Sequence, residues 1–323
     1  MLRLIKNKPI IIVPGEPNSI FLEIYFKSIK KYKFKSPIVL ICSFDLLKLQ
    51  MKKLKYDYKI NIIKENEIKS NLKINKINLI DVSYKIKKPF EKITDKSNNY
   101  IKDCFDIALR LLKKKITYKF INGPISKKHF LKNKYLGITE YLAKKTKSKK
   151  FAMLIFNKKL SVSPITTHLP IKHVSNKISK KIITEKVKLI NDFYINLLKF
   201  KPKFGITGLN PHCESIHPFN EDEKIVRPSV KFLNKKNINI KGPYAADTIF
   251  LKKNRKNYNI IIGMYHDQVL TPLKTLYEYD AINITLGLPF IRVSPDHGPN
   301  ESMIGKNKSN YLSLFNSIKF LDF

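Results

Sequence analysis

The chain has 323 residues, of which 43% are hydrophobic, and it carries 63 Lys and Arg against 25 Asp and Glu, a formal net charge of +38. This hydrophobic content excludes a wholly disordered chain, and the length allows two domains at ~150 residues each. No apolar run approaches the ~20 residues of a membrane-spanning helix, and the run at 10–13 is too short for a secretory signal. We therefore expect a cytoplasmic protein without membrane contact.

Short β-branched runs alternate with amphipathic stretches along the chain. Strands are predicted at 9–13, 38–42, 78–81, 117–121, 151–156, 203–207 and 259–264. Helices are predicted at 98–115, with Ser97 as the N-cap, and at 184–200, while Asn220 before three acidic residues predicts another helix start. This alternation predicts an α/β protein with a largely parallel sheet. No Gly/Ser-rich linker separates its parts, so two closely joined domains are expected.

The positive charge raises the possibility of a nucleic-acid partner. However, the basic residues are 58 Lys and only five Arg, and the lysines are spread along the chain, whereas base readout favours Arg. We interpret the charge as a solvated surface set by composition and expect no specific nucleic-acid partner. A polyanion-binding protein stays open as an alternative, and a basic cleft that attracts an anionic substrate fits either interpretation.

The three cysteines, Cys42, Cys104 and Cys213, are odd in number and far apart in the sequence. They form no CxxC pattern and predict no disulfide framework, which is typical of a reducing compartment.

Three of the seven histidines, His168, His212 and His266, share one context, because each follows the end of an apparent strand. In open α/β sheets, ligands bind at the carboxyl ends of the strands. Three imidazoles brought there could hold a divalent metal and leave positions open for substrate. Structural or simply exposed histidines remain the alternative on spacing alone.

Other polar residues lie near these histidines in the sequence. Asp267 follows His266 directly, and Asp247 lies in a turn-like segment; either carboxylate could orient a ligand or move a proton, or could simply cap a helix or turn. Lys274 lies eight residues after His266. Arg292, one of few arginines, suggests a planar fork that grips carboxylate or phosphate, with a structural salt bridge as the alternative.

Two common nucleotide motifs are absent from the sequence. No GxGxxG follows the first predicted strand, and no GxxxxGK[ST] occurs anywhere. The residues by themselves therefore predict a metal-dependent α/β enzyme that acts on an anionic small molecule.

Several segments together resemble the 4-hydroxythreonine-4-phosphate dehydrogenase family of pyridoxal phosphate biosynthesis. The segments run through nearly the whole chain in family order, and the second half is the closer match. They are 14–17 (PGEP), 122–125 (NGPI), 137–140 (GITE), 166–170 (TTHLP), 208–212 (GLNPH), 242–248 (GPYAADT), 265–268 (YHDQ), 283–292 (NITLGLPFIR) and 296–298 (DHG).

The resemblance implies an isocitrate/isopropylmalate dehydrogenase-like fold of two α/β/α domains with a cleft between them. It also implies a homodimer whose active sites are shared between subunits. We expect a terminal domain at 1–125 plus 275–323 and a central domain at 126–274. The implied cofactors are NAD, bound without the usual Gly-rich fingerprint, and a divalent metal (Zn, Co, Mg or Mn).

The resemblance also assigns roles to individual residues. The implied metal ligands are His168, His212 and His266. The implied substrate contacts are Thr139, Lys274, Asn283 and Arg292, and the implied NAD contacts are His297 and Gly298. Asp247, Asp267 and Lys274 are the candidates for proton transfer, and which one is the base stays open.

The implied reaction is the NAD-dependent oxidation and decarboxylation of 4-phosphohydroxy-L-threonine to 3-amino-2-oxopropyl phosphate. One departure concerns Ile138, which stands where the family has a substrate-contacting histidine. The loss of one hydrogen bond to a charged group costs about 1.5–3 kcal/mol, roughly a ten- to hundredfold change. A related dehydrogenase of threonate or erythronate phosphate is therefore the alternative.

Overall fold

The computed structural model describes residues 8–132, 134–214 and 219–323. Within these ranges the chain divides into two compact units. The terminal unit comprises the residues up to 142 together with 289–323, and the central unit comprises 143–288. The expected domain boundaries lay at 125 and 274. No helix in the described ranges is long and apolar enough to cross a membrane.

The terminal unit is built on a parallel sheet with the strand order β3-β4-β2-β1-β5-β12. Its strands are β1 (Ile10–Val13), β2 (Ile38–Cys42), β3 (Ile60–Ile62), β4 (Ile77–Asp81), β5 (Lys119–Asn122) and β12 (Ile291–Pro295). Every residue of β1 and β5 is buried. A buried strand that is apolar throughout, as β1 is, is typical of a parallel sheet that helices cover on both faces.

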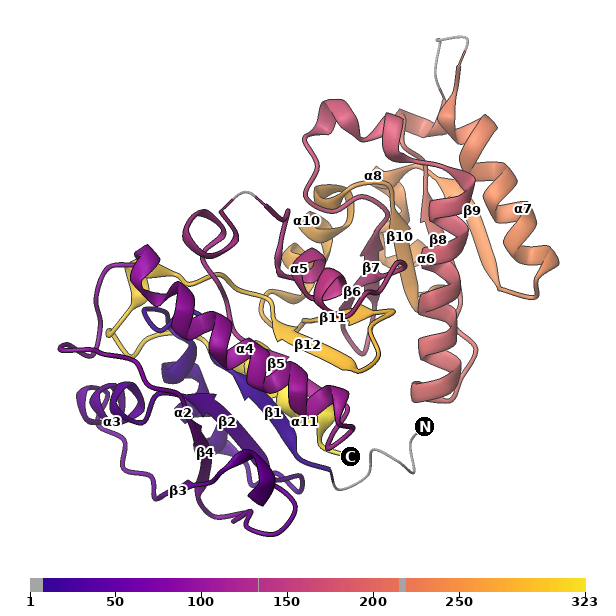
Figure 1. The fold of residues 1–323 in the computed structure, drawn as a ribbon. Helices are drawn as coiled ribbons and strands as arrows, with labels where there is room; N and C mark the ends of the chain where they lie inside the picture. The colour runs from indigo at the N-terminus through magenta and orange to yellow at the C-terminus, as the bar shows by residue number, and fades with distance from the viewer. Residues whose placement is uncertain (1–7, 133, 215–218) are drawn as a thin grey trace. The chain divides into compact units, whose positions relative to one another are not determined.

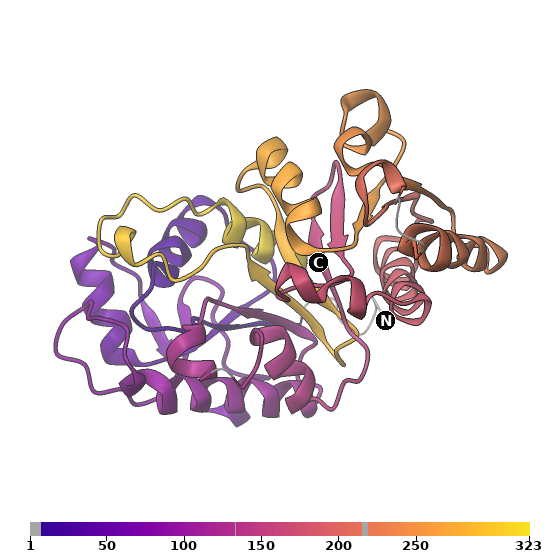
Figure 2. The same ribbon diagram turned by 90° about the horizontal axis from the view of Figure 1, so that it is seen from above.

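Helices lie on both faces of this sheet. One face carries α4 (Asn98–Lys113), and the other carries α2 (Phe21–Lys31), α3 (Phe44–Lys53) and α11 (Leu312–Leu321) (Figures 1 and 2). The helix predicted at 98–115 is confirmed as α4, which ends two residues earlier.

Ser97 does not cap α4, and that prediction is wrong. Its side chain makes no cap hydrogen bond to the helix, and its Oγ instead donates to Glu16 Oε2 at 3.2 Å. The hydroxyl thus donates to the buried carboxyl group of Glu16, and its oxygen accepts from no amide of the first turn of α4.

The central unit has a mixed sheet with the strand order β11-β6-β7-β10-β8-β9. Its strands are β6 (Ala152–Phe156), β7 (Ser161–Pro164), β8 (Phe204–Thr207), β9 (Ile240–Tyr244), β10 (Ile260–Gly263) and β11 (Ile282–Leu286). Strands β7, β10, β8 and β9 are parallel, while β6 runs antiparallel to β7 and β11. The buried side chains of Ile155, Val162, Ile261 and Leu273 belong to its core.

The helices of this unit are α6 (Lys180–Phe193), α7 (Arg227–Lys235), α8 (Ala246–Ile249), α9 (Lys252–Arg255) and α10 (His266–Tyr277), and α5 (Ile138–Lys145) spans the division between the units. Short 3-10 or π turns lie at 65–67, 95–97, 127–131, 171–173, 175–177, 194–198, 211–213, 222–226 and 301–303. The predicted helix start at Asn220 is confirmed, because its Oδ1 accepts from the amides of Asp222 and Glu223.

The apolar run from Asn283 to Arg292 is not one element. It divides into β11 and β12 at Gly287, which has a φ of +88°. A Cβ at this position would lie 2.1 Å from the carbonyl oxygen of Lys150, so only glycine fits the turn. Asn283 therefore belongs to the central unit and Arg292 to the terminal unit.

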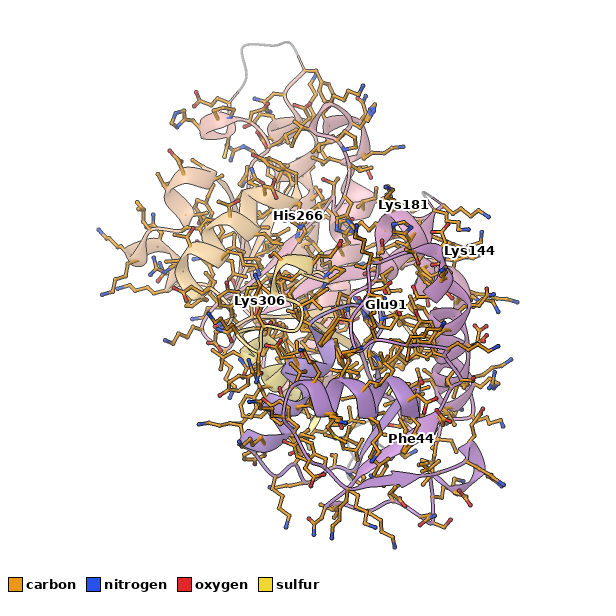
Figure 3. All side chains as sticks on the ribbon, turned by 90° about the vertical axis from the view of Figure 1, so that its left-hand side faces the viewer. Phe44, Glu91, Lys144, Lys181, His266 and Lys306 are labelled. Atoms are coloured by element: carbon orange, nitrogen blue, oxygen red, sulfur yellow. The ribbon has the colours of Figure 1, made fainter. Side chains whose placement is uncertain are left out.

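Most of the basic side chains are at the surface, whereas those of Lys119 and Arg292 are buried. Lys144, Lys181 and Lys306 are exposed examples in Figure 3. The three cysteines are free and buried. The lysines thus form a solvated surface, as the composition predicts.

Candidate active site

The three candidate metal ligands follow three neighbouring parallel strands of the central unit. His168 follows β7, His266 follows β10 and His212 follows β8, and β10 pairs with both of the other strands. The imidazole rings of His168 and His266 approach to a centroid distance of 5.7 Å. The carboxyl edge of this sheet therefore brings together two imidazoles that are 98 residues apart in sequence.

A carboxylate holds the ring of His266. Its Nδ1 lies 2.6 Å from Asp267 Oδ1, and the Asp267 side chain is 77% exposed. A carboxylate on one ring nitrogen fixes the tautomer in which the other nitrogen carries the lone pair, the form that binds a metal. His266 is the first residue of α10 (Figure 3), so the start of that helix sets its position.

His212 lies in a short turn after β8 and has a φ of 55°. Its side chain is exposed, and residues 215–218, which follow shortly, lie outside the described ranges. Among the described residues, no group of three or more His, Cys, Asp or Glu could hold a metal ion. Of the three predicted ligands, the structure brings the rings of His168 and His266 close to each other.

Gln268 joins the loops that carry the histidines, a role that sequence reasoning missed. Its Oε1 accepts from Thr207 Oγ1 at 2.8 Å and from the amide of Met264 at 2.6 Å. Its Nε2 donates to the carbonyl oxygen of Gly208 at 2.8 Å. The side chain is buried, so these bonds tie the end of β8 to the start of α10. The YHDQ motif included Gln268 but did not indicate its partners.

Asp222 anchors the loop before His212. Its carboxylate accepts from the amides of Leu209 and Asn210 at 2.7 and 3.0 Å. Asp222 is fully buried, and a Cβ at Gly208 would approach its Oδ1 to 2.9 Å. The sequence indicated only that Asp222 lies at the start of a helix. It did not indicate the contact with the loop, because the two partners lie 12 and 13 residues earlier.

The other predicted residues of the central unit lie on three different elements. Asp247 is exposed on α8, and Lys274 is half-buried on α10, two turns after His266. Asn283 is the second residue of β11, and its buried Oδ1 has no hydrogen-bond partner among the described residues. A buried amide oxygen of this kind requires a donor, which a bound ligand could supply.

The terminal unit contains a buried arginine. Arg292 is 1% exposed; its Nε donates to Asn122 Oδ1 at 2.7 Å and its Nη1 to Thr139 Oγ1 at 3.3 Å. Burial lowers the pKa of Arg292 to about 10, against an opposing effect of Glu140, so the guanidinium is still charged at neutral pH. Asn122 was not predicted as a site residue, because it lies 170 residues from Arg292.

Two loops meet at the carboxyl ends of β1 and β5, beside Asn122. The amide of Glu16 donates to the carbonyl oxygen of Pro124 at 2.8 Å. Glu16 is buried, and desolvation raises the pKa of its carboxyl group against hydrogen bonds from Asn18 and Ser97. This meeting point lies where the strand order turns back, the usual ligand position in open α/β sheets.

The predicted NAD contacts follow β12. His297 Nδ1 lies 2.9 Å from the carbonyl oxygen of Gly298, and a Cβ at Gly298 would meet no atom within 4 Å. Open space at this backbone is compatible with the close approach of a ligand. Ile138, which replaces the family histidine, is the half-buried first residue of α5.

In both units, buried polar groups lie at the carboxyl edge of an α/β sheet. This arrangement is typical of an α/β enzyme that acts on a small polar ligand. The family model described as pyridoxal phosphate biosynthetic protein PdxA matches residues 33–321. The chain therefore belongs to the PdxA family.

Individual relatives are similar along nearly the whole chain. The 4-hydroxythreonine-4-phosphate dehydrogenase of Sulfurihydrogenibium sp. is 37% identical, with 94% of each chain covered. The D-threonate 4-phosphate dehydrogenase of Salmonella typhimurium is 29% identical, with 97% of this chain and 98% of the relative covered.

Solved structures agree with this assignment. The crystal structure of 4-hydroxythreonine-4-phosphate dehydrogenase from Klebsiella pneumoniae has a TM-score of 0.83 and 27% identity, covering 98% of both chains. A β-decarboxylating dehydrogenase from Thermococcus kodakarensis has a TM-score of 0.50 and 10% identity, over 97% of this chain and 82% of that one, a likeness of fold alone. The predicted family and α/β fold class are confirmed, and the chain is a dehydrogenase of the PdxA family.

Proposed function

We propose that this chain oxidises and decarboxylates 4-phosphohydroxy-L-threonine, with NAD as the hydride acceptor and a divalent metal, in pyridoxal 5′-phosphate biosynthesis. The product would be 3-amino-2-oxopropyl phosphate. The observation that carries the proposal is the His168–His266 pair at the sheet edge, in a chain with full-length similarity to enzymes of that name.

The metal would be held by His168 and His266, with His212 as the proposed third ligand. When bound there, a divalent metal would acidify the substrate hydroxyl and stabilise the negative charge that develops as CO2 leaves. The chain's own residues would position this chemistry. Asp267, whose Oδ1 lies 2.6 Å from His266 Nδ1, would hold the imidazole in the tautomer that can bind a metal.

The charged groups of the substrate need partners of opposite charge. Lys274 and Arg292 would hold its phosphate or carboxylate, and Thr139 and Asn283 would form hydrogen bonds with the substrate. The buried Oδ1 of Asn283, which has no partner in the described chain, could accept from a donor group of the substrate. The proton of the substrate hydroxyl would go to Asp247, Asp267 or Lys274.

NAD would accept the hydride beside His297 and Gly298, where the backbone is open. We also propose that two copies of the chain share their active sites and that the protein works in the cytoplasm. The expected terminal and central domains, at 1–125 plus 275–323 and at 126–274, belong to this proposal.

The reaction is tested by NADH formation at 340 nm, with metal-loaded protein, NAD and 4-phosphohydroxy-L-threonine. We expect turnover that a chelator removes and that added metal restores. His266→Ala should abolish turnover and lower the bound metal per chain, because the paired imidazole is lost. The matched control is His173→Ala, an exposed histidine in a short turn, which should retain both.

Unchanged turnover in His266→Ala would remove the metal-site proposal. If the protein is folded and binds metal but does not turn over this substrate, the result would instead favour the alternative, a dehydrogenase of threonate or erythronate phosphate. The specific observations for that alternative are the apolar Ile138 and the similarity to D-threonate 4-phosphate dehydrogenase. The ratio of kcat/KM for the two substrates decides between them.

A further inference from the structure

A cavity of about 380 Å³ lies in the terminal unit, between the end of α2, the segment before β2, Tyr58 and the segment before β4. We propose that it is a second binding site, for phosphorylated compounds that carry a planar aromatic ring. Its volume is within the range of small-molecule pockets.

The cavity lies away from the candidate active site of the same unit. Its lining includes Ile38 and Ile77, which are the first residues of β2 and β4. Asn122, the partner of Arg292, is instead the last residue of the parallel strand β5. The cavity and the Asn122–Arg292 pair thus lie at opposite edges of one sheet, and the cavity is independent of the proposed reaction.

The charge of the lining suits an anion. Four lysines line the cavity and no Asp or Glu does. Lys30 and Lys31 lie in the last turn of α2, where cations also interact favourably with the helix dipole. Lys33 and Lys76 lie outside the helix, so the dipole does not account for them. Lysine ammonium groups in this lining could bind a phosphate.

The aromatic residues of the lining suit a planar ring. Tyr32, which is 39% exposed, and the half-buried Tyr58 present their rings at the walls, whereas the ring of Tyr25 is almost completely buried. Rings in such a wall provide flat apolar surface for stacking and a polar hydroxyl at the tip.

Tyr25 could contribute a hydrogen-bond donor to the cavity. The residue belongs to the lining and is 1% exposed. Burial raises the pKa of Tyr25, so the hydroxyl keeps its proton and can donate. An acceptor atom on a molecule in the cavity could therefore accept a hydrogen bond from this hydroxyl.

The test is a fluorescence titration of the full chain with pyridoxine 5′-phosphate in 150 mM salt. This probe has the ring and the phosphate but no aldehyde that could react with lysine. We expect it to bind at least tenfold more tightly than either inorganic phosphate or pyridoxine. The double variant Lys33→Gln/Lys76→Gln should weaken binding at least tenfold, and Tyr25→Phe severalfold.

The matched control is Lys252→Gln/Lys253→Gln, which makes the same change of charge on exposed residues of α9. It should bind the probe as the wild type does, and circular dichroism should show all variants folded. Equal loss in the two double variants would reduce the effect to overall charge and overturn the proposal. So would the absence of probe binding, or wild-type binding by the Lys33/Lys76 variant, whereas failure of the dehydrogenase assay would leave these results unaffected.

Discussion

At the residue scale, Arg292 has its guanidinium held from two sides. Asn122 accepts from Nε and Thr139 from Nη1, and the side chain is almost completely buried. A buried charge of this kind is costly unless it is fully paired, so the two partners hold the fork in one orientation. The scarcity of arginine in the sequence drew attention to this residue, but not to Asn122.

We predict that Arg292→Lys lowers kcat/KM for the phosphorylated substrate at least tenfold, with circular dichroism unchanged. A lysine cannot bond Asn122 and Thr139 together and still present a planar fork. Steady-state NADH kinetics measure the effect. Arg110→Lys, which alters an exposed pair with Glu65, is the control and should keep wild-type kinetics. Wild-type kinetics in Arg292→Lys would show that Arg292 does not hold substrate.

At the element scale, helix interiors are easier to predict than helix ends. The apolar spacing placed one helix at 184–200, whereas α6 begins at Lys180 and a π turn at Tyr194–Leu198 follows it. The helix starts earlier because Ser179 caps it, its side chain accepting from the amide of Ile182 at 3.3 Å. Hydrophobic periodicity does not report on such a local polar contact.

Ser179→Ala should lower the free energy of unfolding by about 1 kcal/mol, because the first turn of α6 loses its acceptor. Urea denaturation followed by circular dichroism measures the change. The control is Ser175→Ala, a half-buried serine in the preceding turn that has no cap role. An equal effect of the two substitutions would contradict a specific cap at Ser179.

The element α10 also shows why site residues cluster. It begins at His266, carries Asp267 and Gln268 in its first turn, and presents Lys274 two turns later. One helix thus brings a candidate metal ligand, the carboxylate that orients it, and the amide that fixes the neighbouring loop. The spacing of the YHDQ motif reflects this single turn of helix.

At the scale of the whole molecule, the charge of +38 is spread over lysines that composition alone explains. A field of this size attracts any polyanion at low salt, whatever the function of the protein.

We predict that the chain binds duplex DNA at low ionic strength and without sequence preference. The affinity should fall steeply between 50 and 200 mM salt, because counterion release drives the binding. Fluorescence anisotropy with two unrelated duplexes of equal length measures both properties. Preference for one duplex at 150 mM salt would instead support a nucleic-acid function.

The amino-acid sequence by itself determined the alternation of strands and helices, the position of the three histidines after strands, and the family. These features follow from local periodicity and short motifs. Shorter or more polar strands such as β9, which contains Gly242 and Pro243, were not predicted, because they do not alternate and take their stability from neighbouring strands.

Only the tertiary structure decided which polar groups meet. His168 approaches His266 because β7 and β10 are neighbours in the sheet, although two strands and four α-helices lie between them in sequence order. Arg292 reaches Asn122 because β12 lies beside β5. Strand order arises from long-range packing of buried faces, which one-dimensional spacing does not encode. The sequence therefore identified the chemistry, and the order of the strands decided where it is assembled.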